Sequence, residues 1–153
     1  MDDFEMKTFT LDEAQALLPV LEALLKRAIE GKKAAESIEG RMQELARKIM
    51  LSGGLLVDIS RVRRQRTALE SHLQAAKDSV AEIDAIGVQV KDLDTGLLDF
   101  PCEINGEIVL LCWKLGESSI DFWHTVEDGF RGRQPIDDRF KGKKKKQKPE
   151  QPN

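Results

Sequence analysis

The sequence lacks tyrosine altogether, and aromatic residues make up only 5% of its 153 residues. It has two cysteines and two histidines, too few for a disulfide framework or a zinc ribbon. No window holds the roughly 18 apolar residues that a membrane span needs. The N-terminal stretch MDDFEMKTF is acidic and has no basic region followed by an apolar run, so it does not resemble a secretion signal. We therefore expect a cytoplasmic protein without a membrane span.

Charge is present in abundance but is unevenly distributed. Charged residues are 33% of the chain and apolar residues 41%, a balance typical of soluble proteins with long exposed helices. Residues 129–153 contain nine Lys or Arg against three acids, a net charge of +6, whereas residues 1–128 carry −9. The basic C-terminal end and the acidic body therefore predict different partners.

The N-terminal half predicts a helical hairpin over residues 10–86. The sequence TLDE at Thr10–Glu13 is a capping box, and apolar residues then recur with heptad spacing for about 40 residues. We expect a turn at Ser52–Gly54 and a second helix from Leu55 that ends at Gly87. Pro19 predicts a kink in the first helix, and Gly31 and Gly40 leave open whether that helix is continuous. The predicted seam consists of Leu11, Ala14, Leu18, Leu21, Leu25, Ala28, Ala35, Met42, Leu45 and Ile49 in the first helix and Leu55, Ile59, Val62, Arg66, Leu69, Leu73, Ala76, Val80 and Ile83 in the second.

The C-terminal half predicts a small antiparallel sheet in residues 88–136. Asn105–Gly106 is a strong hairpin signal, and a two-residue turn there places Ile104 opposite Glu107. In this register Cys112 points to the face opposite Cys102, which disfavours a disulfide and agrees with a reducing compartment. One sheet face then consists of Leu98, Phe100, Cys102, Ile104, Val109, Leu111 and Trp113.

These patterns predict an α+β fold in which the sheet packs on the base of a long, coiled-coil-like hairpin. We expect residues 1–136 to form a single domain. The lysine-rich segment that contains KGKKKKQKPEQPN cannot bury enough apolar surface to offset the entropy of ordering it. Residues 137–153 are therefore predicted to be disordered.

Three segments resemble one bacterial family. FTLDEAQALLP, IGVQVKDLDTGLLDFP and LCWKLGESSIDFWHTVEDGFRGRQPI occur in this order in domain-of-unknown-function family 2203. The resemblance covers residues 8–136. It implies a fold of this kind but no activity, and the lysine-rich tail lies outside it.

The stretch FWHTVEDGFRGRQP is the candidate ligand site. If WHTVED forms a helical turn, His124 shares a face with Glu127 and Asp128, so the three could bind a small molecule or a metal, or act as an acid–base pair. Asp92, Asp94, Asp99 or Asp121 could add oxygen ligands. The simpler interpretation, which we favour, is a structural histidine at the sheet edge, and we assign no metal ligands and no cofactor. The predicted ligand-binding residues are Trp123, His124, Glu127, Arg131 and Arg133.

A second candidate surface is the basic cluster at the start of the second helix. Antiparallel pairing brings Arg41, Arg47 and Lys48 alongside it, and only Glu44 and Asp58 offset the seven positive charges. Such a surface could contact nucleic acid through phosphates, although no aromatic residue is interleaved for base stacking. A solvated helical face is the simpler interpretation. The predicted nucleic-acid contacts are Arg61, Arg63, Arg64 and Arg66.

Covalent catalysis has little support in the sequence. There is no GxSxG motif and no phosphate-binding glycine loop, and Cys102 is expected to be buried in an apolar face, where its pKa would rise. We therefore expect a protein without enzymatic activity, an interaction or assembly module that forms a homodimer or binds a protein partner through its hairpin.

Overall fold

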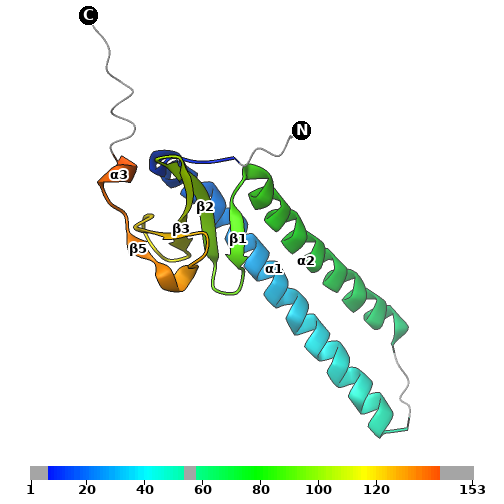
Figure 1. Cartoon of the computed structure of the whole chain (residues 1–153). Helices are drawn as coiled ribbons and strands as arrows, with labels where there is room; N and C mark the ends of the chain where they lie inside the picture. The colour runs from blue at the N-terminus through cyan, green and yellow to red at the C-terminus, as the bar shows by residue number, and fades with distance from the viewer. Residues whose placement is uncertain (1–6, 54–57, 142–153) are drawn as a thin grey trace, which may run out of the picture. The chain divides into compact units, whose positions relative to one another are not determined.

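The computed structural model describes residues 7–53 and 58–141, which form two long helices, a five-stranded sheet and two short helical turns. Figure 1 labels most of these elements. The helices are α1 (Leu11–Leu51), α2 (Ile59–Ile86) and α3 (Asp138–Lys141), and a 3-10 turn, η1, covers Phe130–Gly132. The strands are β1 (Gln89–Asp92), β2 (Leu97–Ile104), β3 (Glu107–Lys114), β4 (Phe122–Thr125) and β5 (Gln134–Pro135). The α+β prediction is confirmed.

The chain divides into two compact units, which are Leu24–Glu82 and the remainder, Met1–Ala23 with Ile83–Asn153. The helical unit, Leu24–Glu82, contains most of both long helices, which run antiparallel (Figure 1). The sheet unit contains all five strands and the first turns of α1. None of the helices in residues 7–53 and 58–141 has the length and apolarity needed to cross a membrane.

The ends of the long helices follow from their local sequence. The backbone N–H of Glu13 donates to Thr10 Oγ1 at 3.1 Å, and the N–H of Thr10 donates to Glu13 Oε1 at 2.9 Å, which is the predicted capping box. At the start of α2 the carboxylate of Asp58 accepts from the N–H of Arg61 at 3.2 Å. Gly87 ends α2 as predicted, with a φ of 106° that a side chain would disfavour. The predicted helix start at Leu55 lies outside the described residues.

Helix α1 is continuous through Pro19, Gly31 and Gly40. In the helical unit a Cβ atom built on Gly31 would lie 2.9 Å from the carbonyl oxygen of His72 and 3.2 Å from Cβ of Ala76. The missing side chain of Gly31 therefore permits the close approach of the two helices. Nothing lies within 4 Å of the same position on Gly40.

Burial in the helical unit is confined to residues 24–38 of α1 and 76–79 of α2. Ala35 and Ala76 are buried, but Ile59 is 65% exposed, and Arg66 and Leu73 are also exposed. These three heptad positions are therefore not covered within the single chain.

The sheet is antiparallel throughout, with strand order β1-β2-β3-β4-β5. Asn105 and Gly106 have φ values of 52° and 84°, as a type I′ turn requires, and the predicted pairing of Ile104 with Glu107 is confirmed. The predicted apolar face is buried, and the ring of Phe9, just before α1, packs edge-on against Phe100 with centroids 5.9 Å apart. The first turns of α1 thus belong to the core of the sheet unit.

Order extends past the predicted boundary at Ile136. Residues 138–141, which we expected to be disordered, form α3, and Phe140 is only 5% exposed because its ring packs on Trp123 at 5.7 Å between centroids. Arg139 of the same helix also lies over the Trp123 ring, 5.2 Å from its centre. The rest of the predicted tail, residues 142–153, lies outside the described residues.

Candidate functional site

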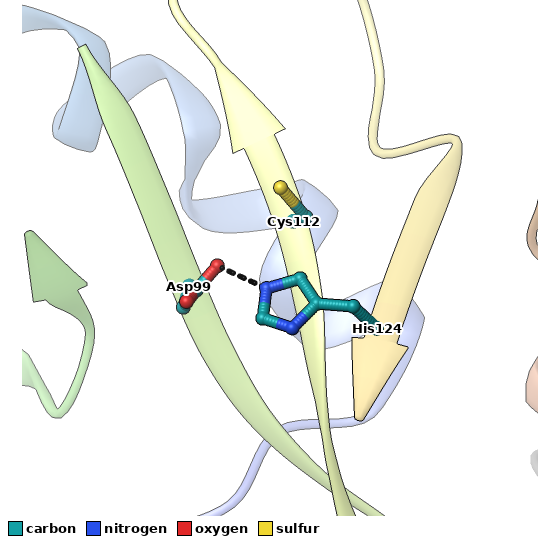
Figure 2. Close-up of side chains that lie close together, drawn as sticks. All are labelled: Asp99, Cys112 and His124. Carbon is teal, nitrogen blue, oxygen red and sulfur yellow. Dashed lines mark hydrogen bonds and ion pairs between the residues drawn. The ribbon is translucent and has the colours of Figure 1, made fainter. Parts of the chain in front are cut away.

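Three neighbouring strands place an acid, a thiol and an imidazole together inside the sheet unit. Asp99 on β2 pairs directly with Cys112 on β3, and His124 on β4 pairs with Leu110, two residues before Cys112. Figure 2 shows the three side chains on one face of these strands. This face is opposite the one that contains Phe100, because side chains alternate along a strand. Asp99, Cys112 and His124 are 1%, 0% and 2% exposed, and we refer to them as the buried triad.

Both ring nitrogens of His124 have partners. Nδ1 lies 2.8 Å from the carbonyl oxygen of Thr125, and Nε2 lies 3.1 Å from Oδ1 of Asp99. A carbonyl oxygen can only accept, so Nδ1 carries a proton and donates it. The contact between Nε2 and Asp99 then needs one further proton, carried either by the imidazole or by the carboxyl group. In both cases the pair has no net charge, which suits its burial.

The carboxyl group of Asp99 is only partly satisfied. Burial raises the pKa of Asp99 above its usual value, and the neighbouring His124 opposes this rise. Its second oxygen, Oδ2, is buried and makes no conventional hydrogen bond with the described residues, and a weak contact with the Cys112 thiol also opposes the rise in pKa. Such an oxygen costs free energy unless something binds to it.

Cys112 is a neutral thiol in this environment. Burial raises its pKa to about 11, and the positive charge of Arg133 opposes the rise. Neither Cys112 nor Cys102 forms a disulfide, in agreement with the prediction from the register. A cysteine nucleophile needs a base that accepts its proton, and His124 directs its two nitrogens at Asp99 and Thr125 instead. The arrangement is therefore not that of a Cys–His nucleophile.

Arg133 lies beside Cys112 of the buried triad and contacts an acid and two aromatic rings. Its Nη2 donates to both carboxylate oxygens of Glu117 at 3.0 and 2.9 Å. The guanidinium carbon lies 4.2 Å from the ring centre of Phe122 and 4.5 Å from that of Phe130. Arg133 is thus paired with an acid of the same unit.

The structure separates the five residues of the predicted ligand site. Residues 122–125 form a strand, so the helical turn that would place His124 on one face with Glu127 and Asp128 does not form, and Trp123 points to the face opposite His124. Glu127 and Arg131 are exposed and are not part of the buried triad. Only His124 and Arg133 lie in or next to it.

Gly132 lies between Arg131 and Arg133, where the chain comes close to Asp128. A Cβ atom built on it would lie 2.5 Å from Cβ of Asp128. The glycine therefore allows a tight turn of the chain, and no ligand is needed to explain it.

Asp99 was one of four acids that could add oxygen ligands to His124, and Cys112 was considered only as a partner of Cys102 in a disfavoured disulfide. The signal for the triad was nevertheless present. The register that places Cys102 opposite Val109 also places Asp99 opposite Cys112. The sequence does not show where β4 lies, because its position depends on long-range pairing with β3.

The predicted nucleic-acid residues are all exposed on the first turns of α2. Arg63 and Arg64 line an open depression with four small residues of the same helix. Arg47 is paired with Glu44 at 2.7 Å. The full lining of the depression is Ser60, Arg63, Arg64, Thr67, Ala68 and Ser71.

The fold and the site define the class of this protein, an α+β protein that combines an antiparallel helical hairpin with a five-stranded antiparallel sheet and a buried Asp–Cys–His cluster. The chain belongs to the DUF2203 family, described as an uncharacterised conserved protein, whose family model matches residues 7–136. No curated protein and no solved structure matches this chain.

Proposed function

We propose that this protein is a non-enzymatic assembly module that associates with a second copy of itself through its helical hairpin. The observation that carries the proposal is the lack of any buried side chain in the outer segment of the hairpin, residues 39–53 and 58–75. In contrast, the adjoining part of the helical unit buries Leu25, Ala28, Ala35 and Ala76, among others.

The outer segment nevertheless exposes large apolar side chains, of which Ile59 belongs to the predicted seam and Met50 and Leu51 follow its last position on α1, Ile49. Met50, Leu51 and Ile59 are 81%, 73% and 65% exposed, and they flank the connection between the helices. Exposed large apolar side chains that form a continuous patch mark an association site, and we infer that these three contribute to one. A second hairpin related by a two-fold axis would cover this surface on both copies at once and give a four-helix arrangement.

Association should be measured by sedimentation velocity over a wide range of protein concentration. We expect the wild-type protein to show the mass of a dimer, and the triple variant Met50→Gln, Leu51→Gln, Ile59→Gln to need at least about tenfold more protein to dimerise, since about 1.4 kcal/mol corresponds to a factor of ten. Circular dichroism checks that the variant keeps its helices.

A matched control is available in the sheet unit. Val20 and Val126 are 52% and 58% exposed, and Val20→Gln with Val126→Gln should leave the association unchanged. A wild-type protein that remains monomeric at every concentration would contradict the proposal.

A second function, nucleic-acid binding, is favoured by one observation, the depression on α2 that combines Arg63 and Arg64 with three hydroxyl side chains. Guanidinium and hydroxyl groups are common phosphate contacts. No Phe or Trp occurs in the outer segment, so binding would depend on phosphates and would weaken steeply with salt.

We expect Arg63→Gln with Arg64→Gln to weaken binding of a single-stranded RNA and to make the salt dependence shallower. Each lost phosphate contact reduces the slope of log K against log salt by about 0.7. Fluorescence anisotropy between about 50 and 200 mM salt measures both effects. The control, Arg27→Gln with Lys33→Gln, removes two exposed charges elsewhere in the helical unit. Equal losses in both double variants would indicate a general charge effect and no site.

A further inference from the structure

We propose that Asp99, Cys112 and His124 form a zinc site, with a carboxylate oxygen, the Cys112 sulfur and Nε2 of His124 as ligands. One ligand atom from each residue lies within 4.8 Å of the other two. Within residues 7–53 and 58–141, no other group of three His, Cys, Asp or Glu side chains brings its ligand atoms within this distance. The sequence raised His124 and Asp99 among several possible ligands but not Cys112, because the three come from different strands and have no short-motif spacing.

The distances suit an ion of this size. A point at the centre of three atoms that are at most 4.8 Å apart lies about 2.8 Å or less from each. Zinc bonds are about 2.0 Å to nitrogen and about 2.3 Å to sulfur, so side-chain movements of less than about 1 Å complete the coordination. The backbone of the paired strands already holds the three residues in place.

The donor set is one that zinc accepts. Thiolate, imidazole and carboxylate are the three ligand types of protein zinc sites, and a mixed set of sulfur, nitrogen and oxygen disfavours magnesium and calcium, which prefer oxygen alone. Three protein ligands leave a fourth position for a water molecule or another ligand.

Two features outside the three ligand atoms independently point to an ion. His124 donates its other ring N–H to the carbonyl of Thr125, and this contact orients Nε2 as the ligand in most zinc-bound histidines. Asp99 also keeps a buried oxygen, Oδ2, that makes no conventional hydrogen bond in the described structure, and the Cys112 thiol is close enough to the carboxyl group to lower its pKa. Binding of a metal ion to the carboxylate would compensate for this missing hydrogen bond.

The charges balance when zinc binds. Without metal the triad holds a thiol proton on Cys112 and one proton between Asp99 and His124. Zinc replaces both, two protons are released to solvent, and the dication with one thiolate and one carboxylate is again neutral. The nearby charge of Arg133 is already compensated by Glu117, at 2.9 Å.

The test is zinc retention by the full chain. The protein is unfolded in a denaturant that contains a chelator, and the chelator is then removed. The chain is refolded with a small excess of Zn²⁺ and desalted, and its mass is measured by native mass spectrometry. We expect one zinc per chain in the wild type and in two controls, Cys102→Ser and His72→Gln, which alter the other cysteine and the other histidine. Cys112→Ser should lose the metal. The proposal would be overturned if the refolded wild-type protein retained no zinc, or if Cys112→Ser retained as much zinc as the wild type.

A second measurement keeps the test decisive if Cys112→Ser does not fold. Refolding with Co²⁺ gives a thiolate-to-cobalt charge-transfer absorption in the near ultraviolet when sulfur is a ligand. In Cys102→Ser the remaining cysteine is Cys112, so the band must then arise from it. Loss of the band in this variant would overturn the assignment of Cys112. The readout does not depend on dimerisation, so zinc binding and self-association can fail separately.

Discussion

Asp99→Ala is expected to lower the free energy of unfolding of the metal-free protein by about 2–3 kcal/mol, the largest effect that we predict for a polar residue. The substitution removes the partner that Nε2 of His124 contacts at 3.1 Å, and it leaves a 2% exposed imidazole with an unmet hydrogen bond. An unsatisfied buried polar group costs about 1–3 kcal/mol, and the small cavity adds to this. Urea unfolding in the presence of a chelator measures the loss.

Asp99→Asn is the matched control. The amide has nearly the shape of the carboxyl group, and its N–H can donate to Nε2 of a neutral His124 whose proton is on Nδ1. We expect a loss below about 1 kcal/mol. If Asp99→Asn were as damaging as Asp99→Ala, the negative charge of Asp99, rather than its hydrogen bond, would be what the fold requires.

The same pair of proteins reports on pH. Because burial raises the pKa of Asp99, the folded state binds the carboxyl proton more tightly than the unfolded state does. The stabilisation from this proton is complete below the usual carboxyl pKa and is lost as the pH rises through the raised value. The unfolding free energy of wild type minus that of Asp99→Asn should therefore fall as pH increases across this window. A rise would show that the ionised carboxylate is the stabilised form.

Gly31→Ala is expected to destabilise the protein by about 1–2 kcal/mol, although alanine is the better helix former by about 1 kcal/mol. The added methyl group would lie 2.9 Å from the carbonyl oxygen of His72, which belongs to the backbone of α2 and cannot move without shifting that helix. Overpacking of this kind costs about 1–3 kcal/mol. Chemical denaturation followed by circular dichroism gives the difference.

Gly40→Ala, on the same helix, is expected to change the free energy of unfolding in the opposite direction. Nothing lies within 4 Å of the added atom, so only the helix propensity changes, and we expect a gain of up to about 1 kcal/mol. If both substitutions stabilised the protein, the helices would not approach closely at Gly31 in solution. If both substitutions destabilised the protein, helix propensity would not determine the effect of a substitution at Gly40 on stability.

Local signals were read correctly because they involve residues close in sequence. The capping box at Thr10, the helix end at Gly87 and the turn at Asn105–Gly106 each depend on a few neighbouring residues. The turn length then sets the register of β2 with β3, and with it the buried apolar face. The family resemblance, too, is confirmed over residues 7–136.

Where the sequence failed, a contact between distant residues decided the outcome. WHTVED has helical spacing of its polar groups, but the ladder between β3 and β4 holds His124 in a strand. Phe140 orders α3 by packing on Trp123, which no local pattern in a polar segment indicates.

The sequence by itself determined the helical hairpin, the strand register and the apolar face, since periodicity and turn chemistry act over short range. Only the tertiary structure decided that Asp99, Cys112 and His124 meet in a buried cluster. They lie on three strands, 13 and 12 residues apart in sequence, and it is sheet pairing that brings their side chains within 4.8 Å.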